Sequence, residues 1–450
     1  MTAAAADAGD APPGLASRRV AYRVLRRVHG GGAWSGPALD RALRGARLDA
    51  RDRAFAANLA YETLRWEGTL DWALARVVTR RLDDVEDAVR DVLRLGAWQL
   101  LFGRVPDRAV VSTSVDLSRA EISPRTAGFV NGVLRALARE RERLPWPPPD
   151  DDRGLALATG HPEWVVASAR QRFGDRARAV LEAGNTPPGV TLRAVADRDA
   201  LLAELAAAGV AASGGRAATA VRAPGVDPGA LAAVAEGRAV VQDDASQLVV
   251  TALAAAAGGL DGAVVYDACA APGGKATHLA QLGARVVAGD VHPGRVGQLA
   301  DLAARLDLRG EVLPVVADAA APPLRAEGVD AVLLDAPCTG LGTVRRRPEL
   351  RWRRSADDPA RLGTLQLGLL EAVAELVRPG GVLVYSVCTW PQEETAEVVT
   401  AFLAAHGDRF TADQPDLGGA GTRLPGDPGV QLAPDADEVD GMYVALLRRR

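Results

Sequence analysis

From Ala263 onward, the chain alternates between short apolar runs and longer segments with helical spacing. The apolar runs are GAVVYDA, ARVVAGD, EVLPVVADA, DAVLLDA and GVLVYSVCT. This alternation predicts a parallel sheet with helices on both faces, because parallel neighbours are joined by crossover connections. We therefore expect an α/β domain whose ligands bind at the carboxyl ends of its strands.

The front of the chain has a different pattern. Apolar residues recur there at helical spacing, as in Val20, Val24 and Val28, with few alternating β-branched residues. This pattern predicts an all-α helical domain over residues 15–146.

A proline-rich segment follows the helical part. LPWPPPDDD, residues 144–152, holds four prolines and three aspartates, a composition that disfavours both helix and central strand and predicts a domain linker. Residues 155–247 mix helical segments with short strands such as VTLRAV and RAVVQ. We expect a small α/β domain there, with the larger α/β domain over residues 248–450.

The cysteine content and the absence of long apolar runs exclude some protein classes. Three cysteines are too few for a disulfide framework, and no pair has the spacing of a zinc knuckle. No apolar run approaches the ~18 residues that a membrane-spanning helix needs. We therefore expect a cytoplasmic protein with no metal site and no membrane partner.

Basic residues are unevenly distributed along the chain. Residues 1–147 hold 24 arginines against 18 acidic residues, whereas the rest holds 29 basic and 39 acidic residues. This excess fits either a polyanionic partner or a solvated helical surface. Of the 53 basic residues only Lys275 is a lysine, and it closes a glycine-rich turn. Its survival in an arginine-rich chain suggests a specific role.

The glycine-rich turn DACAAPGGK follows the first strand of the large domain and precedes a helix. Small residues let the backbone approach a ligand, although glycine also serves ordinary turns. The next strand ends at Asp290, 17 residues after Gly273, close to the ~20 expected for a carboxylate that binds a ribose hydroxyl. Asp318 ends a third strand, where it would meet an adenine edge or simply form a turn. Few glycines and the missing N–H of Pro272 favour S-adenosylmethionine over a dinucleotide.

Two cysteines lie at the ends of neighbouring predicted strands. Cys338 follows the fourth strand and Cys388 the fifth, so both are expected at the same crevice. A strand-end cysteine is ordinarily a small buried hydrophobe, but two in equivalent positions favour chemistry. Methylation of cytosine C5 needs a thiolate that adds to C6 and a group that helps to remove the C5 proton.

Several sequence blocks together resemble the bacterial 16S rRNA (cytosine-C5)-methyltransferases of the Sun/Fmu (RsmB) family, close to the NOL1/NOP2/Sun group. They are DACAAPGGKATHLA, DAPCTGLGTVRRRPELRW, YSVCTWPQEE, QDDASQLV and DGMY. RLGAWQLLFGRVP and AGFVNGVLR resemble the NusB-like front end of that family, and HPEWVV with GNTPP resembles its middle RNA-binding segment. The resemblance implies a NusB-like RNA-binding domain, a small α/β RNA-binding domain and a Rossmann-like catalytic domain.

The resemblance also implies residue roles. Cys388 would be the nucleophile, Cys338 would help to release the methylated base, and Asp335 would lie between the methionine part of the cofactor and the base. Asp290 would hold the cofactor ribose and Asp318 would meet its adenine. The remaining cofactor-binding residues would be Cys269, Ala270, Ala271, Pro272, Gly273, Gly274 and Lys275.

An arginine-rich run, RRRPELRWRR over residues 345–354, follows the Cys338 block. Arginine beside an aromatic residue suits phosphate contact and base stacking, although a charge run can also be merely solvated. The residues expected to bind RNA are Arg345, Arg346, Arg347, Arg351 and Trp352.

We thus expect an enzyme that uses S-adenosylmethionine to methylate a cytosine of 16S rRNA, naked or in a partly assembled subunit, with no DNA partner. A tRNA cytosine-C5 methyltransferase is the first alternative. The second is a NusB-type RNA-binding protein with an inactive cofactor domain. A nicotinamide-dependent dehydrogenase is disfavoured because the G-x-G-x-x-G motif is missing.

Overall fold

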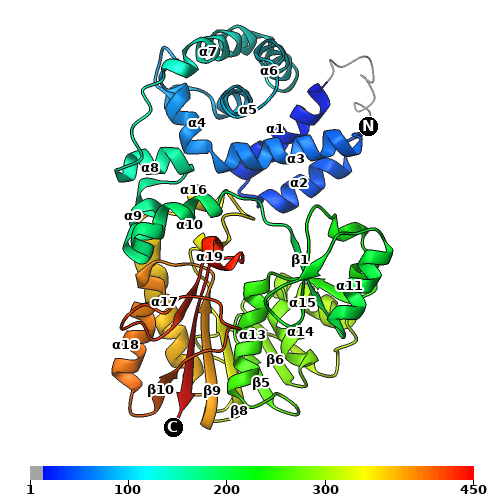
Figure 1. Cartoon of the computed structure of the whole chain (residues 1–450), viewed down its shortest axis with the longest axis vertical. Helices are drawn as coiled ribbons and strands as arrows, with labels where there is room; N and C mark the ends of the chain where they lie inside the picture. The colour runs from blue at the N-terminus through cyan, green and yellow to red at the C-terminus, as the bar shows by residue number, and fades with distance from the viewer. Residues whose placement is uncertain (1–13) are drawn as a thin grey trace. The chain divides into compact units, whose positions relative to one another are not determined.

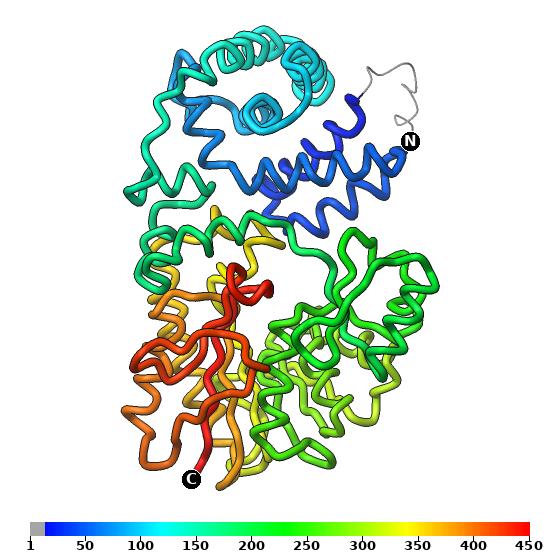
Figure 2. The backbone as a smooth tube through the Cα atoms, viewed as in Figure 1, coloured from blue at the N-terminus to red at the C-terminus, as the bar shows by residue number. Residues whose placement is uncertain are grey.

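The computed structural model describes residues 14–450, which form two compact units. Unit 1 holds residues 14–167 together with Arg347–Arg353, and unit 2 holds Ser168–Arg346 and Arg354–Arg450. Figure 1 labels their helices and strands, and Figure 2 follows the backbone.

Unit 1 is all-helical, as the apolar spacing predicts. Helix α5 packs against α1, α3, α4, α6 and α7, and its apolar residues, Leu93 and Leu95 among them, are buried in the core. Aspartates begin two of the helices: Asp49 accepts a hydrogen bond from the Asp52 N–H, and Asp151 accepts one from the Gly154 N–H. The helices are α1 (Leu15–His29), α2 (Ser35–Arg44), α3 (Ala50–Arg65), α4 (Glu67–Leu74), α5 (Asp87–Leu101), α6 (Asp107–Glu121), α7 (Ala127–Glu140), α8 (Asp152–Thr159) and α16 (Leu350–Arg353).

The proline-rich segment does not separate the two units. It lacks helix and strand up to Asp151, but Leu144 is buried in the helical core and Trp146 stacks on Trp72 with ring centroids 4.4 Å apart. The division falls later, within α9 (Glu163–Phe173), because these aromatic and aliphatic contacts hold the prolines against the helices.

Unit 2 begins with a small antiparallel sheet in the order β2-β3-β1-β4. Its core includes Leu192 and Val221 from the strands and Leu201 and Leu205 from α11, which agrees with the expected small α/β fold. The elements are α10 (Ala177–Ala183), β1 (Val190–Ala194), α11 (Arg198–Ala207), β2 (Ser213–Gly214), β3 (Ala220–Ala223), α12 (Ala232–Ala235) and β4 (Ala239–Val241).

The large sheet of unit 2 has the order β10-β12-β9-β8-β5-β6-β7, with β11 paired to β12. Strands β9, β8, β5, β6 and β7 are parallel, but β12 runs antiparallel to β9, so the sheet is mixed rather than parallel throughout. In Figure 2 the red C-terminal strand lies beside the orange β9. The elements are α13 (Asp244–Ala256), β5 (Val264–Asp267), α14 (Gly274–Gln281), β6 (Arg285–Asp290), α15 (Pro293–Arg305), β7 (Val312–Val316), β8 (Val329–Asp335), α17 (Asp358–Ala374), β9 (Val377–Val387), α18 (Ala396–His406), β10 (Phe410–Asp413), β11 (Val430–Leu432), α19 (Pro434–Asp437) and β12 (Met442–Arg449).

Helices cover both faces of this sheet (Figure 1). Alternate residues of β8 enter different cores: Ala331 and Leu333 pack on the side of α13, α14 and α15, whereas Val332 and Leu334 pack on the side of α17 and α18. A strand buried on both faces explains the continuous apolar run DAVLLDA. The expected Rossmann-like fold is thus confirmed. No helix within residues 14–450 combines the length and apolar character needed to cross a membrane.

Candidate functional site

The two strand-end cysteines meet at the carboxyl ends of β8 and β9. Asp335, the last residue of β8, is in register with Ser386 on β9, so the loops that follow leave the sheet at the same level. The Sγ atoms of Cys338 and Cys388 lie 3.4 Å apart, in contact but not bonded. Parallel register therefore brings together two thiols that are 50 residues apart in sequence.

The environment of Cys338 favours its protonated form. Its contact with Cys388, together with burial, raises the pKa of the Cys338 thiol well above its ordinary value. Once deprotonated, such a sulfur is a strong proton acceptor. Both thiols are half-buried, so the crevice admits a reacting group.

Lys275 and Asp335 form an ion pair in the same crevice. The Lys275 Nζ lies 2.7 Å from Asp335 Oδ2, and the Ser386 hydroxyl donates to Asp335 Oδ1 at 2.9 Å. Burial opposes the charge on Lys275, but the Asp335 carboxylate outweighs it and raises the pKa of the ammonium. The lone lysine thus joins the glycine-rich turn to the strand ends that carry the cysteines.

Asp267, the last residue of β5, is a buried carboxylate without a donor. Its side chain is 0% exposed, and neither oxygen has a hydrogen-bond partner among residues 14–450. Burial, and then the charge of Asp335, raises the pKa of Asp267 to about 8. Unpaired buried charge is costly, so this site favours a cationic group.

The glycine-rich turn packs closely against the domain. Gly273 has φ 108° at the start of α14, and a Cβ there would lie 2.9 Å from Leu299 Cγ, so only glycine fits. The Ala270 N–H donates to the Gly289 carbonyl at 2.8 Å, which fixes the turn beside β6. Cys269 is a poor thiolate, because burial and then Asp267 raise its pKa.

Asp290 and Asp318 follow neighbouring strands. Asp290, which ends β6, is buried and accepts a hydrogen bond from the His292 N–H at 2.9 Å. Asp318 follows β7, is exposed, and accepts one from the Ala320 N–H at 2.9 Å. Each carboxylate therefore uses one oxygen, Oδ1, to shape a local turn.

The arginine-rich run is divided between the two units. In unit 2, Arg346 pairs with Asp440 at 2.8 Å and Asp243 at 2.6 Å, and Arg345 pairs with Asp440 at 3.4 Å. These ion pairs give Arg345 and Arg346 a structural role that does not require contact with RNA.

The remainder of the run is built into unit 1. Arg351 is 0% exposed and donates to the Gly160 carbonyl at 2.9 Å, and Trp352 donates its indole N–H to the Leu64 carbonyl at 2.7 Å. Arg351 is therefore not accessible to RNA in this structure, and the Trp352 indole N–H already has a partner. Arg347 is exposed and lies over the Trp34 ring, 5.6 Å from its centroid.

Sequence reasoning missed a buried network beneath the cysteines. Glu394 is 0% exposed and accepts from the Thr339 N–H at 2.8 Å and the Gln366 amide at 3.0 Å. The Thr339 and Thr389 hydroxyls lie 2.7 Å apart. The available signal was position: each threonine directly follows a cysteine, and Glu394 ends the block YSVCTWPQEE.

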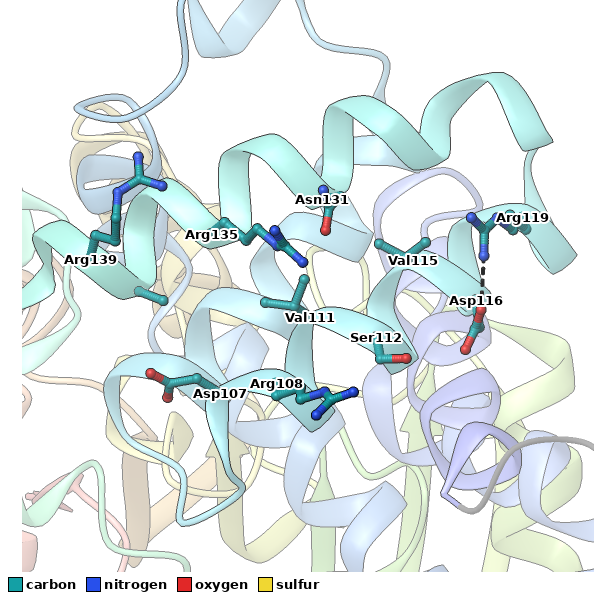
Figure 3. Close-up of a pocket in the computed structure, with 11 residues that line it drawn as sticks. Asp107, Arg108, Val111, Ser112, Val115, Asp116, Arg119, Asn131, Arg135 and Arg139 are labelled. Carbon is teal, nitrogen blue, oxygen red and sulfur yellow. Dashed lines mark hydrogen bonds and ion pairs between the residues drawn. The ribbon is translucent and has the colours of Figure 1, made fainter.

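Unit 1 carries a second candidate site, a groove of about 570 Å³ between α6 and α7 (Figure 3). Its two aspartates are already paired, Asp107 with Arg141 and Asp116 with Arg119. Three exposed arginines of the groove have no acidic partner among residues 14–450. They are Arg108, Arg135 and Arg139.

Comparisons with known proteins account for most of the chain. Residues 256–448 match the 16S rRNA methyltransferase RsmB/F family, residues 15–139 match the NusB family, and residues 161–223 match the ferredoxin-like domain of RsmF/B-like methyltransferases.

Individual relatives match over nearly the full length. Ribosomal RNA small subunit methyltransferase B of Pseudomonas putida is 34% identical, with 96% of this chain and 98% of that protein covered. A Mycobacterium tuberculosis protein described only as a methyltransferase is 39% identical, with 96% of each chain covered. The crystal structure of PH0851 is 26% identical and has a TM-score of 0.83, with 97% of this chain and 99% of that chain covered. These matches exclude a dehydrogenase, and the chain belongs to the 16S rRNA methyltransferase RsmB/F family.

Proposed function

We propose that this rRNA methyltransferase transfers a methyl group from S-adenosylmethionine to C5 of a cytosine in 16S rRNA. The observation that carries the proposal is the pair of half-buried thiols 3.4 Å apart at the carboxyl ends of β8 and β9. Methylation of an exocyclic nitrogen or a ribose hydroxyl needs no cysteine pair, whereas C5 of cytosine needs a nucleophile and a proton acceptor on the same base.

The residues around the crevice fit S-adenosylmethionine, which carries positive charge on its sulfonium and ammonium groups. Asp267 offers a buried carboxylate with no donor, and the amide of Gln242 is likewise buried without a partner within residues 14–450. Asp290 would hold the ribose and Asp318 would meet the adenine. When bound, the cofactor supplies the electrophilic methyl group.

The proposed reaction begins at Cys388. Its sulfur adds to C6 of the cytosine, and the ring electrons make C5 nucleophilic enough to accept a methyl group. Cys338, as a thiolate in contact with the Cys388 sulfur, then accepts the C5 proton. The electrons of the C5–H bond re-form the C5–C6 double bond, the C6–S bond breaks, and Cys388 leaves as a thiolate. Asp335, held by Lys275 and Ser386, would orient the base beside the cofactor.

The other readings are less well supported. A tRNA substrate is disfavoured because the match to the small-subunit rRNA enzyme of P. putida covers 96% of this chain, the helical front end included. An inactive cofactor domain is disfavoured because Cys388, Cys338, Asp335 and Lys275 are all present and arranged at one crevice.

We further propose that the α6–α7 groove contacts the rRNA backbone. Figure 3 shows Arg108 from α6 and Arg135 from α7 on either side of Val111. Exposed guanidinium groups without acidic partners are available to phosphates, unlike Arg345 and Arg346. Arg347 remains the one member of the arginine-rich run that we propose as an RNA contact.

Bisulfite sequencing tests the proposed function directly. Purified protein is incubated with S-adenosylmethionine and either naked 16S rRNA or small subunits, with tRNA as a parallel substrate. We expect one 16S rRNA cytosine to become resistant to conversion, and none in tRNA. Methyl incorporation without a resistant cytosine would place the methyl group on another atom and overturn the C5 assignment.

A further inference from the structure

A buried carboxyl group outside the proposed reaction connects the two cysteine loops. Glu394 lies just after β9, and one of its oxygens accepts from the backbone N–H of Thr339, the residue that follows Cys338. The Thr339 hydroxyl contacts the other carboxyl oxygen. Glu394 therefore holds both the backbone and the side chain of the loop that carries Cys338.

The connection continues to the second loop through a pair of hydroxyl groups. Thr339 Oγ1 lies 2.7 Å from Oγ1 of Thr389, the residue that follows Cys388, and both threonines are 0% exposed. A buried hydroxyl that loses its partner costs about 1–3 kcal/mol, so this contact resists separation. Each cysteine is thus followed by a threonine, and the two threonine hydroxyls are in contact just as the two sulfur atoms are.

Other side chains hold the Cys338 loop in the same place. The Gln366 amide donates to the Pro337 carbonyl at 2.8 Å as well as to Glu394, and the Tyr385 hydroxyl contacts both Gln366 and the Glu394 carbonyl. Arg354 donates to the carbonyls of Cys338 and Thr339, both at 3.1 Å. Several side chains therefore restrain the loop, and Glu394 bonds directly to two of these residues, Thr339 and Gln366.

The proton on Glu394 decides the direction of the hydroxyl chain. An ionised Glu394 accepts from the Thr339 hydroxyl, so the Thr389 hydroxyl must donate to Thr339; a protonated Glu394 can donate instead and release Thr389. Burial raises the pKa of Glu394 to about 7, against the hydrogen bonds from Thr339 and Gln366 and the charge of Arg354, which lower it. The ionisable groups that face it are Arg354, Cys338 and Tyr385.

We propose that Glu394 is a positioning residue that acts through the Thr339 and Thr389 hydroxyls to set the spacing at which Cys338 assists release of the base from Cys388. This inference rests on the proposed function, because release of the base is part of that reaction. The spacing between the Cys338 and Cys388 sulfur atoms can nevertheless be tested without RNA. The clamp comprises Glu394, Thr339 and Thr389. Its loss should impair release more than adduct formation, because only release needs both sulfurs.

The first experiment measures spacing by oxidation. Diamide removes two electrons and two protons from a pair of nearby thiols and leaves a disulfide, which peptide mass spectrometry assigns to Cys338 and Cys388. We expect Thr389→Val to slow this crosslink several-fold, and Thr389→Ser, which keeps the hydroxyl, to restore it. Equal rates in the wild type and Thr389→Val would overturn the clamp, whether or not the protein methylates cytosine.

The second experiment separates the two chemical steps in the folded full-length protein. Single-turnover assays with 16S rRNA follow the formation and the decay of the denaturation-resistant adduct. We expect Thr389→Val and Glu394→Gln to slow decay about tenfold while formation changes less, because a misplaced group weakens only the step that uses it. Thr389→Ser should again be near wild type, and Glu393→Gln is the matched control for charge.

Dependence on pH distinguishes positioning from simple folding support. Decay in the wild type should change as Glu394 titrates around pH 7, and Glu394→Gln should remove that change. Equal slowing of formation and decay, without rescue by serine, would show a merely structural role. Absence of any adduct, even in Cys338→Ala, would instead reject the proposed function. The clamp would then be accepted or rejected on the diamide crosslinking rates alone.

Discussion

The crevice of unit 2 and the α6–α7 groove of unit 1 use charge in opposite ways. In the crevice, Lys275 and Asp335 are paired at 2.7 Å and half-buried. In the groove, Arg108 and Arg135 are exposed and have no acidic partner within residues 14–450. Paired buried groups fix geometry, whereas free exposed groups attract a polyanion and are screened by salt. We therefore expect substitutions in the crevice to cause large, salt-independent effects and those in the groove to cause small, salt-dependent ones.

The cysteine pair should give the largest effect. Cys388→Ala should lower methyl transfer by on the order of 10⁴-fold or more and form no covalent RNA adduct, because the attacking sulfur is lost. Cys338→Ala should accumulate an adduct that survives denaturing electrophoresis, because release is impaired. If the Cys388 variant formed the adduct instead, the two roles would be reversed.

The cofactor side of the crevice comes next. Asp290→Ala should weaken S-adenosylmethionine binding roughly 10- to 150-fold through the lost charge-assisted hydrogen bonds, as measured by calorimetry. Lys275→Arg should also be costly, because a planar guanidinium cannot replace a compact ammonium against Asp335. Exposed Asp301→Ala on α15 serves as the control. Wild-type affinity in the Lys275→Arg protein would mean that the single lysine is an accident of composition.

Asp267 provides a test by pH. The pKa of Asp267 is raised to about 8 in the folded protein, whereas an unfolded aspartate has a pKa of ~4. Between these two pH values only the folded state keeps the proton. The free energy of unfolding should therefore fall as the pH rises from about 4 to about 8. A cationic cofactor favours the ionised form of Asp267. Its binding should therefore become tighter as the pH rises toward about 8, by up to about tenfold per pH unit. Asp267→Asn should show neither trend. A wild-type affinity that is flat between pH 6 and 8 would count against contact between this carboxylate and the cofactor.

Arg346 tests whether the arginine-rich run is structural. Arg346→Gln removes one of the positive charges that pair with the buried carboxylate of Asp440. The free energy of unfolding, measured by urea denaturation, should therefore fall by about 2 kcal/mol. The salt dependence of RNA affinity should hardly change. A large decrease in that salt dependence with stability intact would restore the original expectation that Arg346 binds RNA.

The groove should give the smallest effect. Replacing Arg108, Arg135 and Arg139 by Gln should weaken rRNA binding modestly and lower the slope of log K against log salt by roughly 0.7 for each lost phosphate contact. The same change at Arg41, Arg44 and Arg47 removes equal charge from the same unit and is the control. Identical slopes in the two triple variants would show that the groove has no special role. A changed affinity with an unchanged slope would show that these residues affect RNA binding by means other than phosphate contacts.

Much of the fold follows from local pattern. Helical spacing in unit 1 and the apolar runs in unit 2 depend on side chains only a few residues apart, so they are visible in the sequence. Strand order and the antiparallel β12 are not, because DGMYVALL and GVLVYSV read alike as strands and only their pairing decides direction. The packing of the proline-rich segment is not visible in the sequence for a similar reason: the prolines of LPWPPPDDD exclude helix, but only folding brings Leu144 and Trp146 against distant residues of unit 1.

The sequence by itself predicted which residues would meet at the crevice, but not which charged residues would be paired inside the fold. Cys338, Cys388, Lys275 and Asp335 lie at strand ends and turns, and parallel strands bring such positions to one edge of a sheet. Whether an arginine is free for RNA or balances a buried carboxylate depends on which residues lie beside it across the fold, as Arg346 and Arg351 show. Glu394 escaped notice for the same reason, since a carboxylate becomes a clamp only when folding places Thr339 and Thr389 within hydrogen-bonding distance.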